Sequence, residues 1–231
     1  KKADFVLYRQ HIPLAVIEAK KTRFTPGHGL QQALDYAAAL QAPFVFSSNG
    51  QGFVFHDRTG LLANGETSLA MHEFPSPDLL WAKYREWKRL DADQERIVLE
   101  PYHDDGSGKE PRYYQRNAVN AAVEAIAKGQ PRVLLVMATG TGKTYTAFQI
   151  IWRLWKSKTR RRILYLADRN ILIDQTKTND FKPFGQAMTK ITHRMVDKSF
   201  EIYLSLYQAV TGNEEEKNIY KQFSPDFFDL I

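Results

Sequence analysis

Two carboxylates and a lysine near the start of the chain have residue types and spacing suited to cutting a phosphodiester bond. Asp4 and Glu18 lie in strand-like segments on either side of a turn centred near His11, which places them opposite each other. Side chains alternate along a strand, so Lys20 shares the face of Glu18 while Ala19 points away. The two carboxylates and the Ala19 carbonyl offer oxygen ligands to Mg²⁺, and the lysine can activate metal-bound water or stabilise charge on phosphorus.

The same side chains also fit a surface without catalysis, because Asp, Glu and Lys on one sheet face often form solvated cross-strand pairs. The segment that follows favours the nuclease interpretation. Residues 28–40 are predicted to form a helix with an apolar stripe, on which Gln32 and Tyr36 stand one turn apart. These two side chains therefore share a face and are free to contact a nucleic-acid backbone or the metal site.

A second group of residues is suited to binding nucleotide phosphates. Residues 133–136 are an apolar run predicted to be a buried strand, and Gly140, Gly142, Lys143 and Thr144 follow before a helical pattern begins. The glycines allow a tight turn whose N–H groups point inward, and the helix adds its positive end. In such a loop the lysine reaches the β- and γ-phosphates, and the threonine hydroxyl binds Mg²⁺.

Two observations qualify this phosphate site. Met137 stands where the strict phosphate-loop pattern has glycine, so the start of the loop is less well defined than its end. The alternative is a glycine-rich turn with an exposed lysine. Upstream, the Gln115 amide can pair with both N7 and the N6 amino group of adenine, although a lone glutamine is more often an exposed helix residue.

The predicted elements place these groups in two α/β segments joined by a connector. The first segment, residues 1–75, adds strands at 43–47 and 52–56 to the hairpin and helix. Residues 76–111 are the expected helical connector, in which Asp78 is the predicted N-cap of an amphipathic helix.

Residues 112–231 alternate between helices and strands, which predicts a parallel sheet with helices on both faces. The expected helices are 111–128, 145–156 and one from about 170; the expected strands are 133–136, 163–167, 202–206 and 227–231. We expect the aromatic residues of 145–156 to pack in the core and not to stack on bases. Nucleotide would bind at the carboxyl ends of the strands.

The composition excludes some classes of protein. With 43% hydrophobic and 25% charged residues the chain can bury a core, and no apolar run approaches the roughly 18 residues that span a membrane. The absence of cysteine excludes disulfides and thiolate metal sites and fits a reducing cytoplasm. A net charge of +6 favours a polyanionic partner such as nucleic acid. The chain lacks an initiator Met and ends on an apolar run, so we expect it to be a fragment.

The first segment resembles the core of the PD-(D/E)xK nucleases, most closely the branch with a Gln-x-x-x-Tyr helix. The residues that carry the resemblance are Asp4, Glu18-Ala19-Lys20 and Gln32-Ala33-Leu34-Asp35-Tyr36. It implies a mixed sheet flanked by helices, with Asp4 and Glu18 as Mg²⁺ ligands, Lys20 assisting hydrolysis, and Gln32 and Tyr36 supporting the site. The upstream helix of that family, which often carries another acidic residue, would precede Lys1.

Residues 112–231 resemble the first RecA-like domain of a superfamily 2 helicase or translocase. The motifs are Tyr114-Gln115, the loop from Met137 to Thr144, Leu166-Ala167-Asp168-Arg169, Ser205-Leu206-Tyr207-Gln208, and Phe228-Asp229-Leu230-Ile231. The residues that would bind ATP and its Mg²⁺ are Gln115, Thr139, Gly140, Thr141, Gly142, Lys143 and Thr144. The weaker candidates for contacts near DNA are Asp168, Arg169, Tyr207 and Gln208.

A nuclease of this type before such a motor resembles the R subunit of a type I restriction–modification enzyme, since type III subunits carry the nuclease at the other end. The resemblance implies a cytoplasmic machine that pumps double-stranded DNA with ATP and cuts it, with Mg²⁺, far from the recognition site. Its partners are modification and specificity subunits, and S-adenosylmethionine enters only through the modification subunit. The second RecA-like domain is not in this chain, so we expect the chain alone to hydrolyse ATP poorly.

Two other functions fit parts of the sequence. In a nuclease-inactive ATP-dependent DNA translocase or assembly subunit, the hairpin carboxylates would only scaffold the fold or bind DNA. A plain P-loop kinase predicts neither the nuclease-like hairpin nor Gln115.

Overall fold

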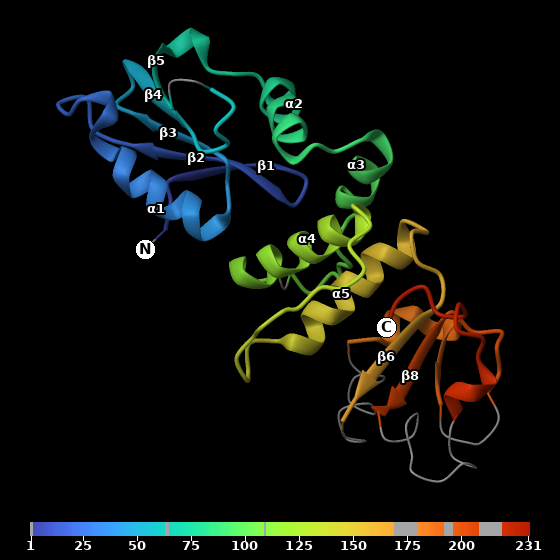
Figure 1. The fold of residues 1–231 in the computed structure, drawn as a ribbon. Helices are drawn as coiled ribbons and strands as arrows, with labels where there is room; N and C mark the ends of the chain where they lie inside the picture. The colour runs from blue at the N-terminus through green and yellow to red at the C-terminus, as the bar shows by residue number, and fades with distance from the viewer. Residues whose placement is uncertain (1, 63–64, 109, 169–179, 192–195, 208–218) are drawn as a thin grey trace. The chain divides into compact units, whose positions relative to one another are not determined.

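The computed structural model describes residues 2–62, 65–108, 110–168, 180–191, 196–207 and 219–231. The chain divides into two compact units, residues 1–133 and residues 134–231, each with its own sheet (Figure 1). Within the described ranges, no helix is both long enough and apolar enough to cross a membrane.

The first unit is a mixed sheet with helices packed against it. Its strands are β1 (Phe5–Arg9), β2 (Ile12–Ala19), β3 (Phe44–Ser48), β4 (Gly52–Asp57) and β5 (Glu66–Ala70). Its α-helices are α1 (Leu30–Leu40), α2 (Pro77–Lys88), α3 (Ala92–Val98) and α4 (Tyr113–Ala127). In the sheet order β1-β2-β3-β4-β5, strands β2 and β3 are parallel and the other neighbours antiparallel. The predicted mixed-sheet α/β architecture is confirmed.

Helix α1 belongs to the crossover that joins the parallel strands β2 and β3, a connection that no hairpin can make. Its buried residues Ala33 and Ala37 pack against Val16 of β2 and Val45 of β3. The predicted apolar stripe is therefore the face that contacts the sheet. A 3₁₀ turn, Pro26–Gly29, precedes the helix and completes the crossover.

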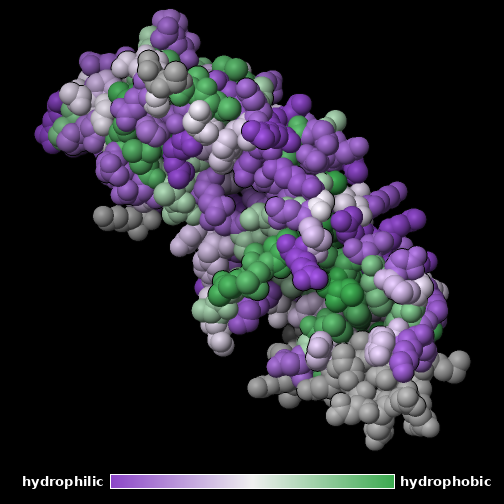
Figure 2. Space-filling view, in the orientation of Figure 1, coloured by the Kyte–Doolittle hydropathy of each residue, from purple (hydrophilic) through white to green (hydrophobic). Residues whose placement is uncertain are grey.

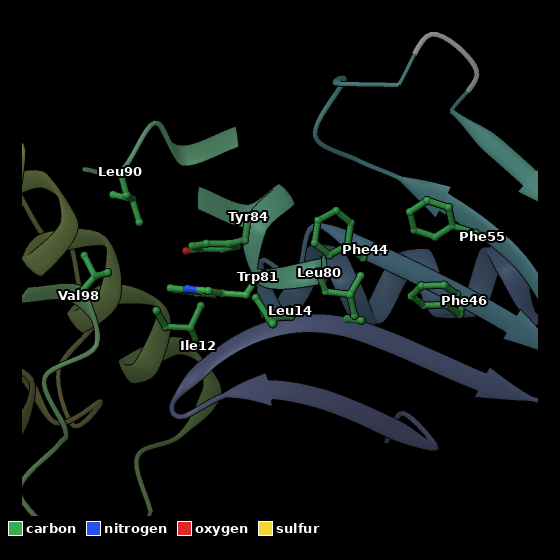
Figure 3. Close-up of a cluster of buried hydrophobic side chains, with 11 residues drawn as sticks. Ile12, Leu14, Phe44, Phe46, Phe55, Leu80, Trp81, Tyr84, Leu90 and Val98 are labelled. Carbon is green, nitrogen blue, oxygen red and sulfur yellow. The ribbon is translucent and has the colours of Figure 1, made fainter. Parts of the chain in front are cut away.

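Helix α2 supplies side chains to a hydrophobic cluster that includes residues of β2, β3 and β4. Leu80, Trp81 and Tyr84 of α2 belong to this cluster together with Phe44 and Phe46 (Figure 3). Trp81 and Tyr84 stack with ring centroids 5.2 Å apart. The cluster ties the connector helix to the sheet as part of one core.

The start of α2 corrects one prediction, because Asp78 is not the N-cap. The Ser76 hydroxyl accepts the N–H of Leu79 at 3.2 Å, and Pro77 takes the first helical position. Serine at this position satisfies one of the free amides of the first turn, and proline has no N–H to satisfy. Asp78 instead lies in the first turn, where its charge complements the helix dipole.

The first hairpin turns close to the predicted centre. Strand β1 ends at Arg9 and β2 begins at Ile12, so the turn is Gln10–His11. Pro13 is accommodated inside β2 because it pairs with Tyr8 at a point where the register shifts. Such a bulge tolerates a residue that cannot donate to the ladder.

The second unit contains helix α5 (Lys143–Lys156) and the strands β6 (Ile163–Ala167), β7 (Met188–Lys190) and β8 (Ile202–Leu206). The strands are parallel, in the order β6-β8-β7, and β6 and β8 have the predicted bounds. Phe148, Trp152 and Trp155 of α5 pack against Phe184, which confirms their prediction as core residues.

Residues 133–136 do not form the buried strand that their apolar sequence predicted. Leu134 and Val136 are 85% and 89% exposed, and the segment pairs with no strand in the described residues. An apolar run becomes a strand only where a neighbour can bond its backbone, so composition alone misled this prediction. Figure 1 shows an extended stretch before α5, and the corresponding surface in Figure 2 is hydrophobic.

The predicted strand at 227–231 was also wrong in extent. Among the described residues, only Leu230 of this segment pairs, through a single parallel bridge to Ile163. Asp229 also holds this segment next to residues 161–162, because its carboxylate accepts the backbone N–H groups of Arg161 and Arg162 at 2.9 Å each. The helix expected from about residue 170 lies outside the described residues.

The buried contacts of α2 predict a large difference between two neighbouring leucines. Leu80 is 2% exposed in the core and Leu79 is 48% exposed. We expect Leu80→Ala to lower the free energy of unfolding by about 2–5 kcal/mol, whereas Leu79→Ala changes it by less than about 0.5 kcal/mol. Urea unfolding with hydrogen exchange at β2 and β3 would measure both variants. Equal losses would contradict the packing described for α2.

The contacts of Asp229 predict a pH dependence. Burial opposes the effect, but the N–H groups of Arg162 and Arg161 and the charges of Arg160 and Arg162 hold the pKa of Asp229 below its ordinary value. Its contribution to stability is therefore complete above pH about 4 and is lost as the pH falls through the lowered pKa. We expect Asp229→Asn to lower the unfolding free energy more at pH 7 than at pH 3, as measured by urea titration. The same loss at both pH values would refute this account.

Candidate functional site

The end of strand β2 brings the predicted nuclease residues together. Glu18 is 2% exposed and pairs in register with Ser47 of the parallel strand β3. The Lys20 ammonium donates to Glu18 Oε1 at 2.7 Å and to Gln32 Oε1 at 3.1 Å. The backbone of Lys20 continues the pairing, since its N–H donates to the Ser48 carbonyl at 2.7 Å. Both charged side chains are thus held by a central part of the sheet.

Helix α1 adds the two polar residues predicted to support the site. Gln32 accepts from Lys20, and its own amide donates to the Tyr36 hydroxyl at 3.3 Å. A continuous polar chain therefore runs from Glu18 through Lys20 and Gln32 to Tyr36. The sequence spacing predicted the shared helix face, and the crossover geometry explains why that face meets the end of β2.

Asp4 contacts the backbone at the end of β2 and not the Lys20 side chain. It precedes β1 and is exposed, and its Oδ2 accepts the backbone N–H of Ala19 at 2.9 Å. The carboxylate is therefore attached to the peptide that follows Glu18, not paired with Lys20. This hydrogen bond anchors the start of the edge strand beside the other candidate residues.

The geometry around Glu18 fits a Mg²⁺ ligand. Its Oε2 atom is buried and has no hydrogen-bond partner, whereas Oε1 is paired with Lys20. An unsatisfied buried carboxylate oxygen is costly unless a cation or proton compensates it. Within the described residues, no group of three or more His, Cys, Asp or Glu side chains could hold a metal ion. Mg²⁺ suits two carboxylates because it commonly keeps several waters.

The phosphate loop has the backbone that its glycines predicted. Gly140 and Gly142 have φ values of 78° and 84°, in the left-handed region, and α5 begins directly at Lys143. Thr141 Oγ1 donates to the Ala138 carbonyl at 2.6 Å. The Lys143 ammonium donates to the Met137 carbonyl at 3.3 Å, so it folds back over the loop.

The two threonines at the ends of the loop, Thr139 and Thr144, differ in exposure. Thr139 is exposed in the loop, and Thr144 is half-buried in the first turn of α5. The amides at the start of a 14-residue helix together with a glycine-rich turn form the usual cradle for an anion. The local geometry therefore suits nucleotide phosphates, although the strand predicted to lead into the loop is missing.

Gln115 has a structural contact that sequence reasoning did not anticipate. Its Oε1 accepts the Arg112 N–H at 2.9 Å and so caps the start of α4, and the residue is 9% exposed. A capping role accounts for a glutamine three residues after the N-cap. Its predicted role on adenine stays a prediction.

The candidate DNA-contact residues lie after neighbouring strands. Asp168 follows β6 and Tyr207 follows β8, and these parallel strands pair in register up to their last residues. Their carboxyl ends therefore meet at one edge of the sheet. Tyr207 is 57% exposed there. Arg169 and Gln208 lie outside the described residues.

A hollow in the first unit contains none of the predicted site residues. It has a volume of about 480 Å³ and is lined by residues that include Arg58, Trp87 and Asn117. Glu124 of α4 lines it and pairs with Lys88 at 3.0 Å and Lys128 at 2.6 Å. Arg58 Nη1 donates to the Ala42 carbonyl at 2.6 Å, so the charged side chains that line the hollow have partners, whereas Glu18 Oε2 has none.

Sequence reasoning did not single out Gly29 and Ser47, which the structure places against the Glu18 and Lys20 side chains. The only signals were a glycine at the start of the α1 pattern and a serine at the end of an apolar strand. Neither has a distinctive spacing, so the contact emerges only from the fold.

Two family models match the chain. Residues 1–61 match "Type I restriction enzyme R protein N terminus", and residues 108–231 match "Type III restriction enzyme, res subunit". The boundary between these matches lies in the segment that contains α2 and α3. The first model is named for type I enzymes and the second for the res subunit of type III enzymes.

Two relatives of known type agree with the first of these matches. The chain is 58% identical to the type I restriction enzyme EcoAI endonuclease subunit of Escherichia coli, covering 100% of this chain and 29% of that protein. It is 28% identical to the EcoKI endonuclease subunit of Escherichia coli strain K12, covering 75% of this chain and 18% of that protein.

The fold comparison gives the same family. A fragment structure of a putative HsdR subunit of a type I restriction enzyme from Vibrio vulnificus YJ016 matches with a TM-score of 0.82 and 39% identity. The match covers 100% of this chain and 41% of that one, so the chain spans less than half the length of these relatives. With a nuclease-type sheet before a phosphate-loop unit, and with these matches over its length, the chain belongs to the family of restriction (R, HsdR-like) subunits of type I restriction–modification enzymes.

Proposed function

We propose that the protein is the motor and nuclease subunit of a type I site-specific deoxyribonuclease. It moves double-stranded DNA with ATP and cuts the DNA, with Mg²⁺, at a distance from the recognition site. The observation that carries the nuclease part is Glu18: a buried carboxylate with one free oxygen, bonded through the other to Lys20. Buried, unsatisfied charge next to a paired cation is typical of functional sites.

The residues of the first unit divide the work of cleavage. Asp4 and Glu18 hold the Mg²⁺, which supplies Lewis-acid activation of water and of the phosphate when it is bound. Lys20 stabilises negative charge on the phosphate that is attacked. Gln32 fixes the position of the Lys20 ammonium, and Tyr36 in turn fixes Gln32. Gln32 and Tyr36 both lie on α1, and Lys20 directly follows β2, so regular elements set the positions of these side chains.

The residues of the second unit bind ATP. Lys143 and Thr144 contact the phosphates and their Mg²⁺, and the other loop residues, Thr139, Gly140, Thr141 and Gly142, shape the cradle. Gln115 belongs to α4 of the first unit, and its selection of adenine is proposed from its sequence motif alone. The strand ends that carry Asp168-Arg169 and Tyr207-Gln208 lie near DNA.

The proposed domain division follows the sequence motifs and differs from the two compact units of the structure, which divide after residue 133. We assign residues 1–75 to the PD-(D/E)xK endonuclease domain, 76–111 to the helical connector and 112–231 to the first RecA-like domain. The partners are DNA and the modification and specificity subunits of the same enzyme. S-adenosylmethionine acts only at the modification subunit.

Removing one residue from each site separates cutting from movement. We expect Glu18→Ala to reduce plasmid cleavage by about 100-fold or more while sparing ATP consumption, because it removes a metal ligand but leaves the motor intact. Lys143→Ala should abolish both activities, because cutting depends on ATP-driven movement. The assay uses the full-length subunit with its partners, a plasmid carrying the recognition site, ATP and Mg²⁺. If Glu18→Ala cuts like the wild type, the subunit is an ATP-dependent translocase or assembly subunit whose hairpin does not catalyse.

Two adjacent glutamines test the role of α1. Gln32 contacts Lys20, whereas Gln31 donates to Asp35 at 3.1 Å on the helix surface. We expect Gln32→Ala to slow cleavage about 10–100-fold, as the loss of a supporting hydrogen bond does in metal sites, and Gln31→Ala to leave it unchanged. The same plasmid assay, with ATP consumption as the folding control, measures both. Matching rates for the two variants would remove Gln32 from the site.

A further inference from the structure

The proposed nuclease site is packed against a residue that has no side chain. We propose, on the basis of that proposed function, that Gly29 is a positioning residue of the site, anchored by Ser47, and that it fixes the geometry of Glu18 and Lys20 by close backbone approach. Gly29 is buried at the end of the 3₁₀ turn Pro26–Gly29, immediately before α1.

The space at Gly29 is closed on three sides by the side chains of the site. A Cβ atom there would lie 2.8 Å from Glu18 Cγ, 2.9 Å from Lys20 Cε and 2.9 Å from Ser47 Oγ. Contacts this short repel strongly, because carbon atoms at van der Waals contact stand about 3.5–4.0 Å apart. The turn can therefore lie this close to Glu18 and Lys20 only with glycine at this position.

Backbone conformation does not explain the glycine. Gly29 has φ −93° and ψ 0°, a right-handed conformation that other residues adopt without a left-handed strain. An alanine would fit the backbone but not the space. The requirement is thus for contact with the site and not for the turn itself.

Ser47 explains how the turn is held against the sheet. Its fully buried hydroxyl accepts the Gly29 N–H at 3.0 Å, and its Cα is the register partner of Glu18 across the parallel strands. The bond satisfies a buried amide at the start of α1, where such groups lack helical partners. The same serine therefore touches the turn on one side and lies beside the carboxylate on the other.

The side chains that a methyl group at Gly29 would displace differ in their freedom to move. The Lys20 side chain is long and can move away, whereas Glu18 is buried in the inner strand β2. Relief of the clash therefore lengthens the 2.7 Å contact between them or lifts the start of α1, which carries Gln32. Either movement disturbs the geometry on which a positioned metal site depends, since shifts of about 0.5 Å matter there.

Gly27 is the matched control. It lies in the same 3₁₀ turn, and a Cβ there would meet only the Val54 side chain, at 3.4 Å from Cγ2 and 4.0 Å from Cβ, which are ordinary contacts. Ser48 is the control for Ser47, because it is the next residue of β3 and its hydroxyl bonds only to the β3–β4 turn, donating to the Gly52 carbonyl at 2.9 Å and accepting from Gly50. Adjacent strand residues face opposite sides of the sheet.

The first experiment compares these variants in the full-length subunit assembled with its partners, on plasmid carrying the recognition site. We expect Gly29→Ala to lower cleavage about 10–100-fold and Ser47→Ala to lower it less, with ATP consumption unchanged. Gly27→Ala and Ser48→Ala should cut like the wild type. Loss of ATP consumption in parallel with cleavage in Gly29→Ala would overturn the proposal, since it would show general damage to the fold.

The second readout is metal binding without turnover. The nucleotide-free full-length subunit is titrated with Mn²⁺, and the free Mn²⁺ is measured by electron paramagnetic resonance. The Mn²⁺ that the Glu18→Ala variant still binds is subtracted as binding at other sites. We expect Gly29→Ala to bind Mn²⁺ about tenfold more weakly with the same stoichiometry, and Gly27→Ala to bind it normally. Wild-type affinity and wild-type cleavage in Gly29→Ala would refute the positioning role alone. A different result, wild-type cleavage by Glu18→Ala, would contradict the nuclease assignment itself.

Discussion

The parallel pairing of β2 with β3 is the constraint on which the first unit depends. Two parallel neighbours cannot be joined by a short turn, so the chain must cross over the sheet between them. The crossover consists of the 3₁₀ turn and α1, and it brings Gln32 to the end of β2 where Lys20 emerges. Residues far apart in sequence meet because the same pairing also sets Glu18 beside Ser47. The polar chain at this edge is thus a product of topology more than of local spacing.

Much of this arrangement could be predicted from the sequence because it rests on periodicity. Alternation along β2 placed Glu18 and Lys20 on one face, and the 3.6-residue repeat placed Gln32 and Tyr36 together on α1. The bounds of β6 and β8 followed from short β-branched and aliphatic runs. The family comparisons agree with the identification.

What could not be predicted depends on neighbours that a sequence does not reveal. The apolar run 133–136 had the composition of a strand but lacks a bonding partner in the described residues. Strand β5 has a polar sequence, and its pairing with β4 makes it a strand. Gln115 matched a nucleotide motif, yet its amide caps a helix. The close approach at Gly29 could not be predicted from the sequence, because a glycine before a helix usually indicates only a turn.

The single hydrogen bond that holds Asp4 has a thermodynamic consequence. Glu18 is fixed in an inner strand before any cation arrives, so its participation requires little further ordering. Asp4 is exposed directly before the edge strand β1, and its carboxylate accepts one amide, so it would lose freedom on binding a cation. In the proposed metal site, cation binding would therefore be entropically unequal, because folding already orders Glu18, whereas Asp4 would be ordered only on binding. Stiffening the edge of the sheet would tighten capture without altering either ligand.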